Sequence, residues 1–237
     1  MALDRNRNSD LGVRTGSALV MVAVAGAALW LGGVAWMGFA LLVAAGVYFE
    51  WGRLVRAFAP RGLSHAAWML GGAIYVGVAT VTLVALRDDA PVAPFVVVLG
   101  VIATDIGAYF SGRAIGGPKI APSISPSKTW AGLFGGMIAA GLVLAVMAGL
   151  AGYMSGMSGG GQPGAFFHTV VAIAFAAGAA LAIVAQAGDF FESWMKRRAG
   201  VKDSGKLIPG HGGLFDRVDG LVAVLFVVGI ASWVLPL

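Results

Sequence analysis

The sequence predicts an all-α integral membrane protein with about seven transmembrane helices. Three observations support this fold class. Of the 237 residues, 59% are hydrophobic and only 11% are charged, whereas a soluble domain usually carries about 25% charged residues. The mean hydropathy of the chain is +0.87. The apolar residues gather in stretches of about 20 residues, which is the length of a helix that crosses a bilayer.

The first 90 residues are expected to form three membrane helices. Residues 1–16 are polar, and the apolar run from Ser17 to Trp51 is too long for the apolar region of a signal peptide. At about 20 residues per crossing, this run suits two short helices with a turn at Gly32-Gly33. A basic segment then precedes the third helix. The three expected helices are 15–31, 34–50 and 66–86.

Four further helices are expected in residues 91–237, and they are separated by two polar loops and a flexible connector at 152–164. The expected helices are 93–111, 130–151, 165–187 and 219–235, and the polar loops are 111–129 and 188–218. We therefore divide the chain into an N-terminal membrane part, residues 1–90, and a catalytic membrane part, residues 91–237.

The basic residues predict the orientation of the protein in the membrane. If the N-terminus is cytoplasmic, every one of the sixteen Lys and Arg residues except Arg87 falls on the cytoplasmic side. The same parity places both polar loops on that side, so we expect a site in cytoplasm-facing loops and helix ends. The basic pI of about 9.9 is then explained by membrane orientation, and we expect no nucleic-acid partner.

The loop at 188–218 concentrates charge and is the first candidate site. Asp189 and Glu192 are three residues apart, so on a helix both carboxylates share one face. Asp216 and Asp219 repeat this spacing. Paired carboxylates suit a hard divalent cation, which prefers oxygen ligands. The alternative is an amphipathic segment with salt bridges one turn apart, and Glu192 with Lys196 fits that alternative well.

The sequence Pro209-Gly-His-Gly-Gly213 within this loop fits the alternative poorly. Glycines on both sides of His211 allow positive φ and a close approach of the backbone to a ligand. Consecutive backbone amides there can bind an anion. With Lys and Arg nearby, the segment favours a polyphosphate and its metal. No Walker A, dinucleotide-binding, HExxH or GxSxG pattern occurs, so the familiar routes to an ATPase, dehydrogenase, protease or esterase lack support.

Two features upstream could complete such a site. Asp105 lies in an apolar helix, where a carboxylate is costly unless it meets a cation or faces water; it could instead fix helix packing. Ser125-Pro-Ser-Lys-Thr129 precedes the fifth helix, where hydroxyl side chains cap helices. Helix N-termini with a nearby Lys such as Lys128 bind anions. Capping and membrane orientation would also explain these residues.

Taken together, these residues resemble the signature of the phosphatidate cytidylyltransferase family, also called CDP-diacylglycerol synthases. The matching pattern is Ser193-x-x-Lys196-Arg197-x4-Lys202-Asp203-x-Gly205-x2-Ile208-Pro209-x-His211-Gly212-Gly213-x-x-Asp216-Arg217-x-Asp219. The resemblance extends upstream to Asp105-x-x-Ala108-Tyr109-x-x-Gly112-Arg113 and Ser125-Pro126-x-Lys128-Thr129-Trp130. The first 90 residues match the family only in hydropathy.

The resemblance implies a multi-span inner-membrane nucleotidyltransferase of phospholipid biosynthesis that requires Mg²⁺. It would join CTP to phosphatidic acid and give CDP-diacylglycerol and pyrophosphate. In this hypothesis the phosphate of phosphatidic acid attacks the α-phosphorus of CTP in line. Positioning and charge neutralisation would carry most of the catalysis. The acyl chains would reach the bilayer through a lateral opening near the fourth to sixth helices.

The hypothesis gives each candidate residue a role. The expected metal ligands are Asp216, Asp219 and Asp189. The residues expected to act on phosphates are Lys196, Arg197, Lys202 and Arg217, with His211 on the departing pyrophosphate. Ser125, Lys128 and Thr129 would close the site, Asp105 would support the metal or a lysine, and Asp203, Gly212 and Gly213 would contact substrate.

Two alternatives remain at this stage, and homodimerisation is left open. The same chemistry could act on another lipid phosphate, such as an isoprenoid glycerol phosphate. A non-enzymatic transporter would explain Asp105 and the glycine content. Transporters usually place charge near the midplane and show internal repeats, whereas the charge here lies in one surface loop and no repeat is visible.

Overall fold

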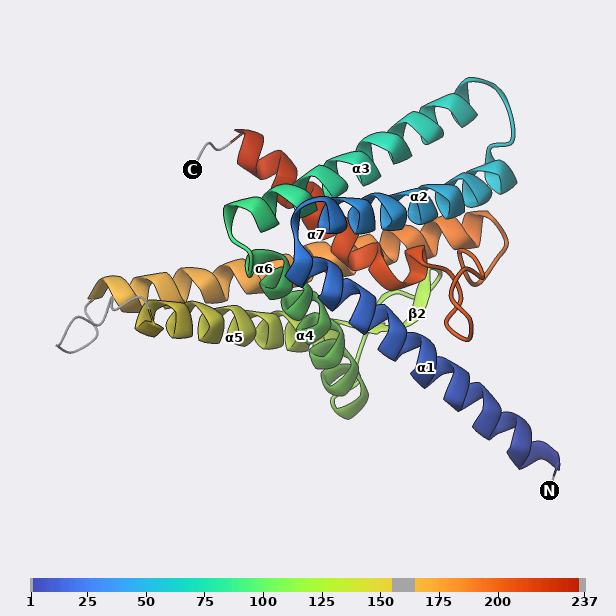
Figure 1. Cartoon of the computed structure of the whole chain (residues 1–237). Coiled ribbons are helices and arrows are strands. Elements are labelled where there is room, and N and C mark those ends of the chain that lie inside the picture. Colours follow the sequence, from blue (N-terminus) through green and yellow to red (C-terminus); the bar gives the residue numbers. More distant parts are fainter. Residues whose placement is uncertain (1, 155–164, 235–237) are drawn as a thin grey trace. The chain divides into compact units, whose positions relative to one another are not determined.

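The computed structural model describes residues 2–154 and 165–234 (Figure 1). Within these ranges the chain forms seven α-helices and one antiparallel pair of short strands. In chain order they are α1 (Ala2–Leu31), α2 (Gly33–Phe58), α3 (Gly62–Asp89), α4 (Ala93–Ala114), β1 (Lys119–Ala121), β2 (Ser125–Thr129), α5 (Trp130–Met154), α6 (Ala165–Arg198) and α7 (Phe215–Val234).

Six of these helices, α2 to α7, are long and apolar enough to cross a bilayer. The apolar part of α1, Thr15–Leu31, is shorter than these six. The protein therefore has the helix lengths and composition of a multi-pass α-helical membrane protein. A seventh crossing by α1 and a cytoplasmic N-terminus stay predictions.

Both polar segments are more ordered than the sequence suggested. Helix α6 continues to Arg198, so residues 188–198 form its last turns instead of the start of a loop. Glu192 and Lys196 form an ion pair one turn apart there. Basic residues in the last turn also complement the helix dipole. The segment 111–129 contains the end of α4 and the β1–β2 ribbon. The expected connector at 152–164 falls mostly outside the described residues.

By packing, the chain divides into two compact units. The first unit contains Met1–Pro91 and Phe191–Leu237, and the second contains Val92–Phe190. The division of the sequence at residue 90 into a membrane part and a catalytic part concerns function and stays a prediction. By packing, however, the C-terminal residues belong with the N-terminal helices.

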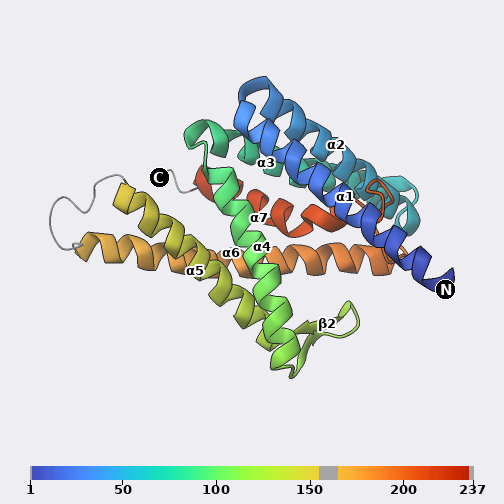
Figure 2. The same cartoon turned by 60° about the horizontal axis from the view of Figure 1, so that its bottom comes forward.

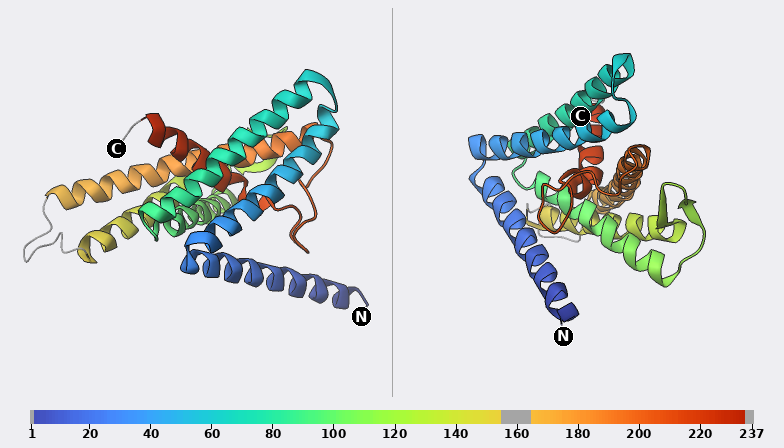
Figure 3. Two further views of the ribbon diagram at one scale, coloured as in Figure 1. Left: turned by 45° about the horizontal axis from the view of Figure 1, so that its top comes forward. Right: turned by 90° about the vertical axis from the view of Figure 1, so that its right-hand side faces the viewer.

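The core of the first unit forms around Trp51 of α2. The Trp51 indole lies within 6.2 Å, centroid to centroid, of the rings of Trp68, Tyr75, Phe191 and Phe215. Its Nε1–H donates to the carbonyl of Trp68 at 3.0 Å. Helix α3 packs against α2 and α7, and Figure 3 (left) shows the blue α2 beside the teal α3. This aromatic core includes Phe191 of α6 and Phe215 of α7, and so holds the two helix ends that flank the charged loop 199–214.

The second unit is built on close contact between α4 and α5. Gly107 of α4 and Gly135 of α5 face each other, and a methyl group at either position would overlap the other's backbone. Such small residues allow membrane helices to approach closely. Gly178 of α6 packs in the same way against the backbone of α5 at Ala140. Figure 2 shows the ribbon at the end of α4, where α5 begins.

Candidate active site

The loop 199–214 of the first unit is shaped by a tight turn at the predicted glycine-rich segment. Ile208 N–H donates to the Gly212 carbonyl at 3.0 Å, and His211 N–H donates to the Ile208 carbonyl at 3.0 Å. Gly210 and Gly212 have φ of 74° and 84°, in the left-handed region that favours glycine. The prediction of positive φ is confirmed at these two positions. Gly213 is needed for space instead, because a Cβ there would meet Ser204 and Glu50.

Lys196 lies between two carboxylates at the start of this loop. Its Nζ forms ion pairs with Glu192 and with Asp216 Oδ1, the second at 2.7 Å. The Glu192 side chain is fully buried, and only 13% of the Lys196 side chain is exposed. The proposed i,i+4 salt bridge is therefore present, but it is joined to Asp216 of α7. Two acids and one lysine give this cluster an excess of carboxylate oxygens.

Asp216 also organises the loop through its second oxygen. Asp216 Oδ2 accepts hydrogen bonds from Ser204 N–H at 3.0 Å and from Gly213 N–H at 2.9 Å. The side chain therefore connects both ends of the loop to the first turn of α7. The sequence predicted only a metal ligand at this position, and the structure shows a residue that holds the loop as well.

The other predicted residues of the first unit lie around this loop. Arg217 Nε donates to the His211 carbonyl at 3.2 Å. His211 Nδ1 lies 2.9 Å from the Ser17 hydroxyl of α1. Asp219 Oδ1 accepts the Gly220 N–H at 2.8 Å. Three further residues predicted for the site have exposed side chains: Arg197, Lys202 and Asp203.

Glu50 contacts this loop and was not predicted from the sequence. Its side chain is fully buried, and its Oε2 accepts hydrogen bonds from the Ser204 hydroxyl at 2.9 Å and Phe215 N–H at 2.8 Å. Helix α2 continues to Phe58, so Glu50 lies inside a helix that was expected to end at residue 50. An acid within an apolar helix is the signal that singled out Asp105, and it would have identified Glu50 too.

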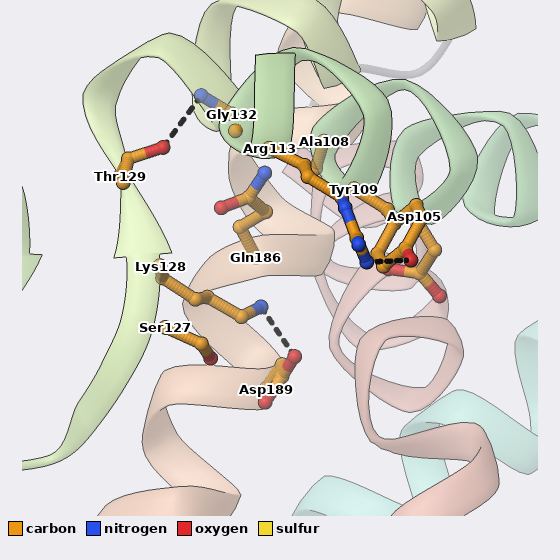
Figure 4. Close-up of a pocket in the computed structure, with 11 residues that line it drawn as sticks. Asp105, Ala108, Tyr109, Arg113, Ser127, Lys128, Thr129, Gly132, Gln186 and Asp189 are labelled. Atoms are coloured by element: carbon orange, nitrogen blue, oxygen red, sulfur yellow. Dashed lines mark hydrogen bonds and ion pairs between the residues drawn. The ribbon is translucent and has the colours of Figure 1, made fainter. Parts of the chain in front are cut away.

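The second unit has its own cavity of about 390 Å³, into which several charged side chains project (Figure 4). Its lining residues are Asp105, Ala108, Tyr109, Gly112, Arg113, Ser127, Lys128, Thr129, Gly132, Gln186 and Asp189. Of these, Lys128 and Thr129 were predicted to close the site, and Asp105 was predicted to support the metal or a lysine. Asp189, predicted as a metal ligand, lines the same cavity. Ser125 lies in β2 and does not line it.

Inside this cavity Lys128 forms an ion pair with Asp189 of α6, and Figure 4 shows the two side chains pointing toward each other. Thr129 Oγ accepts the Gly132 N–H at 3.1 Å and so caps α5, as the sequence predicted. Arg113 Nη1 donates to the Tyr109 hydroxyl at 2.9 Å. The cavity therefore offers two cations, Arg113 and Lys128, and two carboxylates, Asp105 and Asp189, to a polar ligand.

Gln186 is a second residue that the sequence did not indicate. It is 4% exposed and lines the cavity. Its amide nitrogen has no hydrogen-bond partner among residues 2–154 and 165–234. A buried donor of this kind is costly unless a ligand or water satisfies it.

The donor set can be tested against the expected Mg²⁺. Among the described residues no group of three or more His, Asp or Glu side chains is placed to hold a metal. Mg²⁺ commonly takes only one or two protein carboxylates and completes its shell with water and substrate phosphates. Asp216 of the first unit already has partners on both carboxylate oxygens, Lys196 on Oδ1 and two backbone N–H groups on Oδ2, so a Mg²⁺ site there stays a prediction. Of the three predicted ligands, Asp216 and Asp219 belong to this unit, and Asp189 belongs to the second.

Comparison with known proteins gives a consistent assignment. Residues 59–235 match the cytidylyltransferase family, and this range contains every site residue predicted from the sequence. A protein of Brucella suis named phosphatidate cytidylyltransferase is 45% identical over 166 residues, which cover 68% of this chain and 55% of that protein. The chain thus spans about half the length of that relative.

Two other relatives carry the same name. The protein of Rickettsia bellii is 32% identical over 226 residues, covering 94% of this chain and 90% of that protein. The protein of Haemophilus influenzae is 44% identical over 123 residues, covering 52% of this chain and 39% of that protein. The similarity to the Rickettsia protein extends over nearly all of both chains.

Proposed function

The chain belongs to the cytidylyltransferase family, and from this membership we propose that it transfers a cytidylyl group from CTP to phosphatidic acid. The products are CDP-diacylglycerol and pyrophosphate, which places the protein in phospholipid biosynthesis. The observation that carries the proposal is the range of the family match. It includes both the Lys196 cluster of the first unit and the cavity of the second.

In the proposed reaction a phosphate oxygen of phosphatidic acid attacks the α-phosphorus of CTP. The new P–O bond forms as the bond between the α-phosphorus and the bridging oxygen to the β-phosphorus breaks, and pyrophosphate leaves with that oxygen. The attacking phosphate is already an anion, so little proton transfer is needed. Orientation of the two phosphates and neutralisation of their charge then supply most of the rate.

The residues of the first unit suit the triphosphate. Lys196 is held in place by its two carboxylates, so its ammonium group is oriented before substrate arrives. We assign Lys196, Arg197, Lys202 and Arg217 to phosphate oxygens, and His211 to the departing pyrophosphate. Asp203 and the amides of Gly212 and Gly213 are assigned to substrate contact. The His211 carbonyl accepts from Arg217, which orders the turn that would meet the ligand.

We propose Asp216, Asp219 and Asp189 as the carboxylates that hold Mg²⁺. The ion would neutralise negative charge on the triphosphate oxygens when bound. Ser204 and Gly213 hold the Asp216 side chain in one orientation, and binding of the ion would compete with Lys196 for Oδ1.

The cavity of the second unit is proposed to take a polar part of the substrates. Lys128 and Arg113 would contact phosphate or headgroup oxygens, with Ser125 and Thr129 closing the site and Asp105 orienting Lys128. Lys128 is paired with Asp189 in the structure, so binding would exchange one anionic partner for another. An opening toward lipid near α4, α5 and α6 would admit the acyl chains, and the site would face the cytoplasm from the inner membrane.

The proposal is tested by pyrophosphate release from purified protein in detergent. Reactions contain phosphatidic acid and Mg²⁺ with CTP, ATP, GTP or UTP in turn, for the wild type and Asp219→Ala. We expect release only with CTP and lipid together, and a large loss in the variant. Asp88→Ala is the matched control, because Asp88 is an exposed acid at the end of α3 and should keep wild-type activity.

Other results would change the assignment. Release with an isoprenoid glycerol phosphate but not with phosphatidic acid would keep the chemistry and replace the acceptor. Absence of CTP-dependent release with either lipid would overturn the proposed function.

A further inference from the structure

We propose that Glu50 of α2 is a positioning residue for the loop 199–214. Its carboxylate accepts hydrogen bonds from Ser204 within the loop and from Phe215 directly after it. The inference rests on the proposed function, because it concerns the loop that carries Lys202, His211 and the glycine-rich turn. Glu50 lies outside the range 59–235 that matches the family, so nothing in that match assigns it a role.

The geometry places one oxygen of Glu50 at both ends of the loop. Its Oε2 accepts hydrogen bonds from the Ser204 hydroxyl at 2.9 Å and from the Phe215 N–H at 2.8 Å. Ser204 lies near the start of the loop, and Phe215 is the first residue of α7. The first N–H groups of a helix have no partner within the helix, and Glu50 supplies one for Phe215. The carboxylate therefore joins Ser204, in the first half of the loop, to the start of α7.

Two glycines of the loop leave the space that the carboxylate occupies. A Cβ at Gly205 would overlap Glu50 Oε1, and a Cβ at Gly213 would lie 2.6 Å from Oε2. Neither glycine has positive φ, so the backbone conformation does not require glycine at these positions. The reason is close packing: Glu50 approaches Gly205, and the Ser204 hydroxyl together with Glu50 approaches Gly213. A larger residue than glycine at position 205 or 213 would therefore displace the Glu50 carboxylate.

Glu50 is also connected to the predicted chemistry by a short chain of contacts. The Ser204 hydroxyl donates a hydrogen bond to Glu50, and its backbone N–H donates one to Asp216. Asp216 in turn pairs with Lys196 at 2.7 Å. A shift of Ser204 would therefore change the orientation of Asp216, and a displacement of about 1 Å at a catalytic group can cost up to about a hundredfold in rate.

The contacts point to an acceptor role rather than a charge role. Both donors to Glu50 are neutral groups, and in the described part of the chain no Lys or Arg forms an ion pair with it. A neutral side chain of the same length with an oxygen in the Oε2 position should serve as well. A shorter carboxylate would keep the charge and lose the reach.

This difference defines the experiment, which compares Glu50→Gln, Glu50→Asp and Glu50→Ala in the full chain. We expect Glu50→Gln to keep kcat/KM for CTP within about threefold of wild type, because the amide oxygen can replace Oε2. Glu50→Asp and Glu50→Ala should lose about tenfold or more. Ser204→Ala removes one donor to Glu50 without altering α2, and we expect it to lower kcat/KM by less than Glu50→Ala does. This variant provides the comparison if Glu50→Ala does not fold.

Hydrogen exchange supplies a readout that does not depend on activity. We expect faster exchange at the amides of residues 204–215 in Glu50→Asp and Glu50→Ala, with no change in α4 and α5. Thr82→Val is the matched control. Thr82 is a buried polar residue of the same unit whose hydroxyl donates only within its own helix, and its loss should leave loop exchange unchanged.

Two results would overturn the inference. One is wild-type kcat/KM and wild-type loop exchange in Glu50→Ala. The other is rescue by Asp but not by Gln, which would show that the charge matters. If the wild type has no cytidylyltransferase activity, the proposed function fails, and the exchange comparison alone still decides whether Glu50 positions the loop.

Discussion

Lys196 carries its positive charge into a mostly buried position because Glu192 and Asp216 lie beside its ammonium group. The arrangement is sensitive to loss of the cation. Removing one partner of a buried ion pair leaves uncompensated charge, which usually costs more than the intact pair contributes. Here two buried acids share one lysine, so the effect on stability should be large even though the pair itself contributes little.

Lys196→Met should therefore lower the free energy of unfolding by about 3 kcal/mol and abolish CTP turnover. Thermal unfolding in detergent and pyrophosphate release measure the two effects. Lys206→Met is the control for stability, because Lys206 is an exposed lysine of the same loop. Equal unfolding temperatures for the two variants would contradict the structural role of Lys196.

Lys128 and Asp189 offer a second test among single residues. Their side chains are 20% and 31% exposed, so the pair is partly solvated. A double-mutant cycle with Lys128→Met and Asp189→Asn should give a coupling free energy of about 0.5 to 1 kcal/mol in stability. Lys128→Met alone should also raise the KM for substrate. Additive effects on stability would show that the two side chains do not interact.

Among the elements, α4 and α5 show how glycine positions the second unit. Gly135 of α5 faces Ser111 and the carbonyl of Gly107, with no room for a methyl group. Gly77 of α3 has open space around its Cα. The two residues are both helical glycines, but only the first is required by packing. In membranes such close helix contact replaces the hydrophobic driving force that operates in water.

We expect Gly135→Ala to destabilise the protein by about 1 to 3 kcal/mol, because α4 and α5 must move apart. Gly77→Ala should be neutral or stabilising by up to about 1 kcal/mol, since alanine favours helix over glycine. Unfolding of both variants in the same detergent checks the difference. A loss of stability in Gly77→Ala as large as that in Gly135→Ala would argue against packing as the cause.

At the scale of the whole molecule, the distribution of charge predicts how the chain sits in the membrane. With a cytoplasmic N-terminus, Arg87 is the single Lys or Arg of the sequence on the outer side, and Asp88 and Asp89 follow it. The rule that cytoplasmic loops are rich in Lys and Arg then orients every helix. The β1–β2 ribbon and the loop 199–214 should both face the cytoplasm.

The absence of native cysteines makes this orientation directly measurable. Single substitutions Ser123→Cys and Lys206→Cys should be labelled by a membrane-impermeant maleimide only from the cytoplasmic side. Asp89→Cys should be labelled only from the opposite side. All three positions are exposed. Labelling of Ser123→Cys and Lys206→Cys from opposite sides would refute the predicted topology.

Hydropathy and residue spacing were sufficient to predict the membrane class, the approximate helices, the charged loop and the left-handed glycines at 210 and 212. These properties are local, because apolar length and motif order can be read within one segment. The pairing of Lys128 with Asp189 and the double use of Asp216 join residues far apart in the chain. Their contacts could not be predicted, because helix packing decides which side chains meet.

The sequence by itself thus determined the kind of protein and the residues available for chemistry. Only the tertiary structure decided what supports them. Glu50 is 154 residues from Ser204 in sequence, and no spacing rule connects the two. They meet because α2 packs against α7, and because a buried acceptor such as Glu50 Oε2 is costly unless it finds donors, here Ser204 and Phe215.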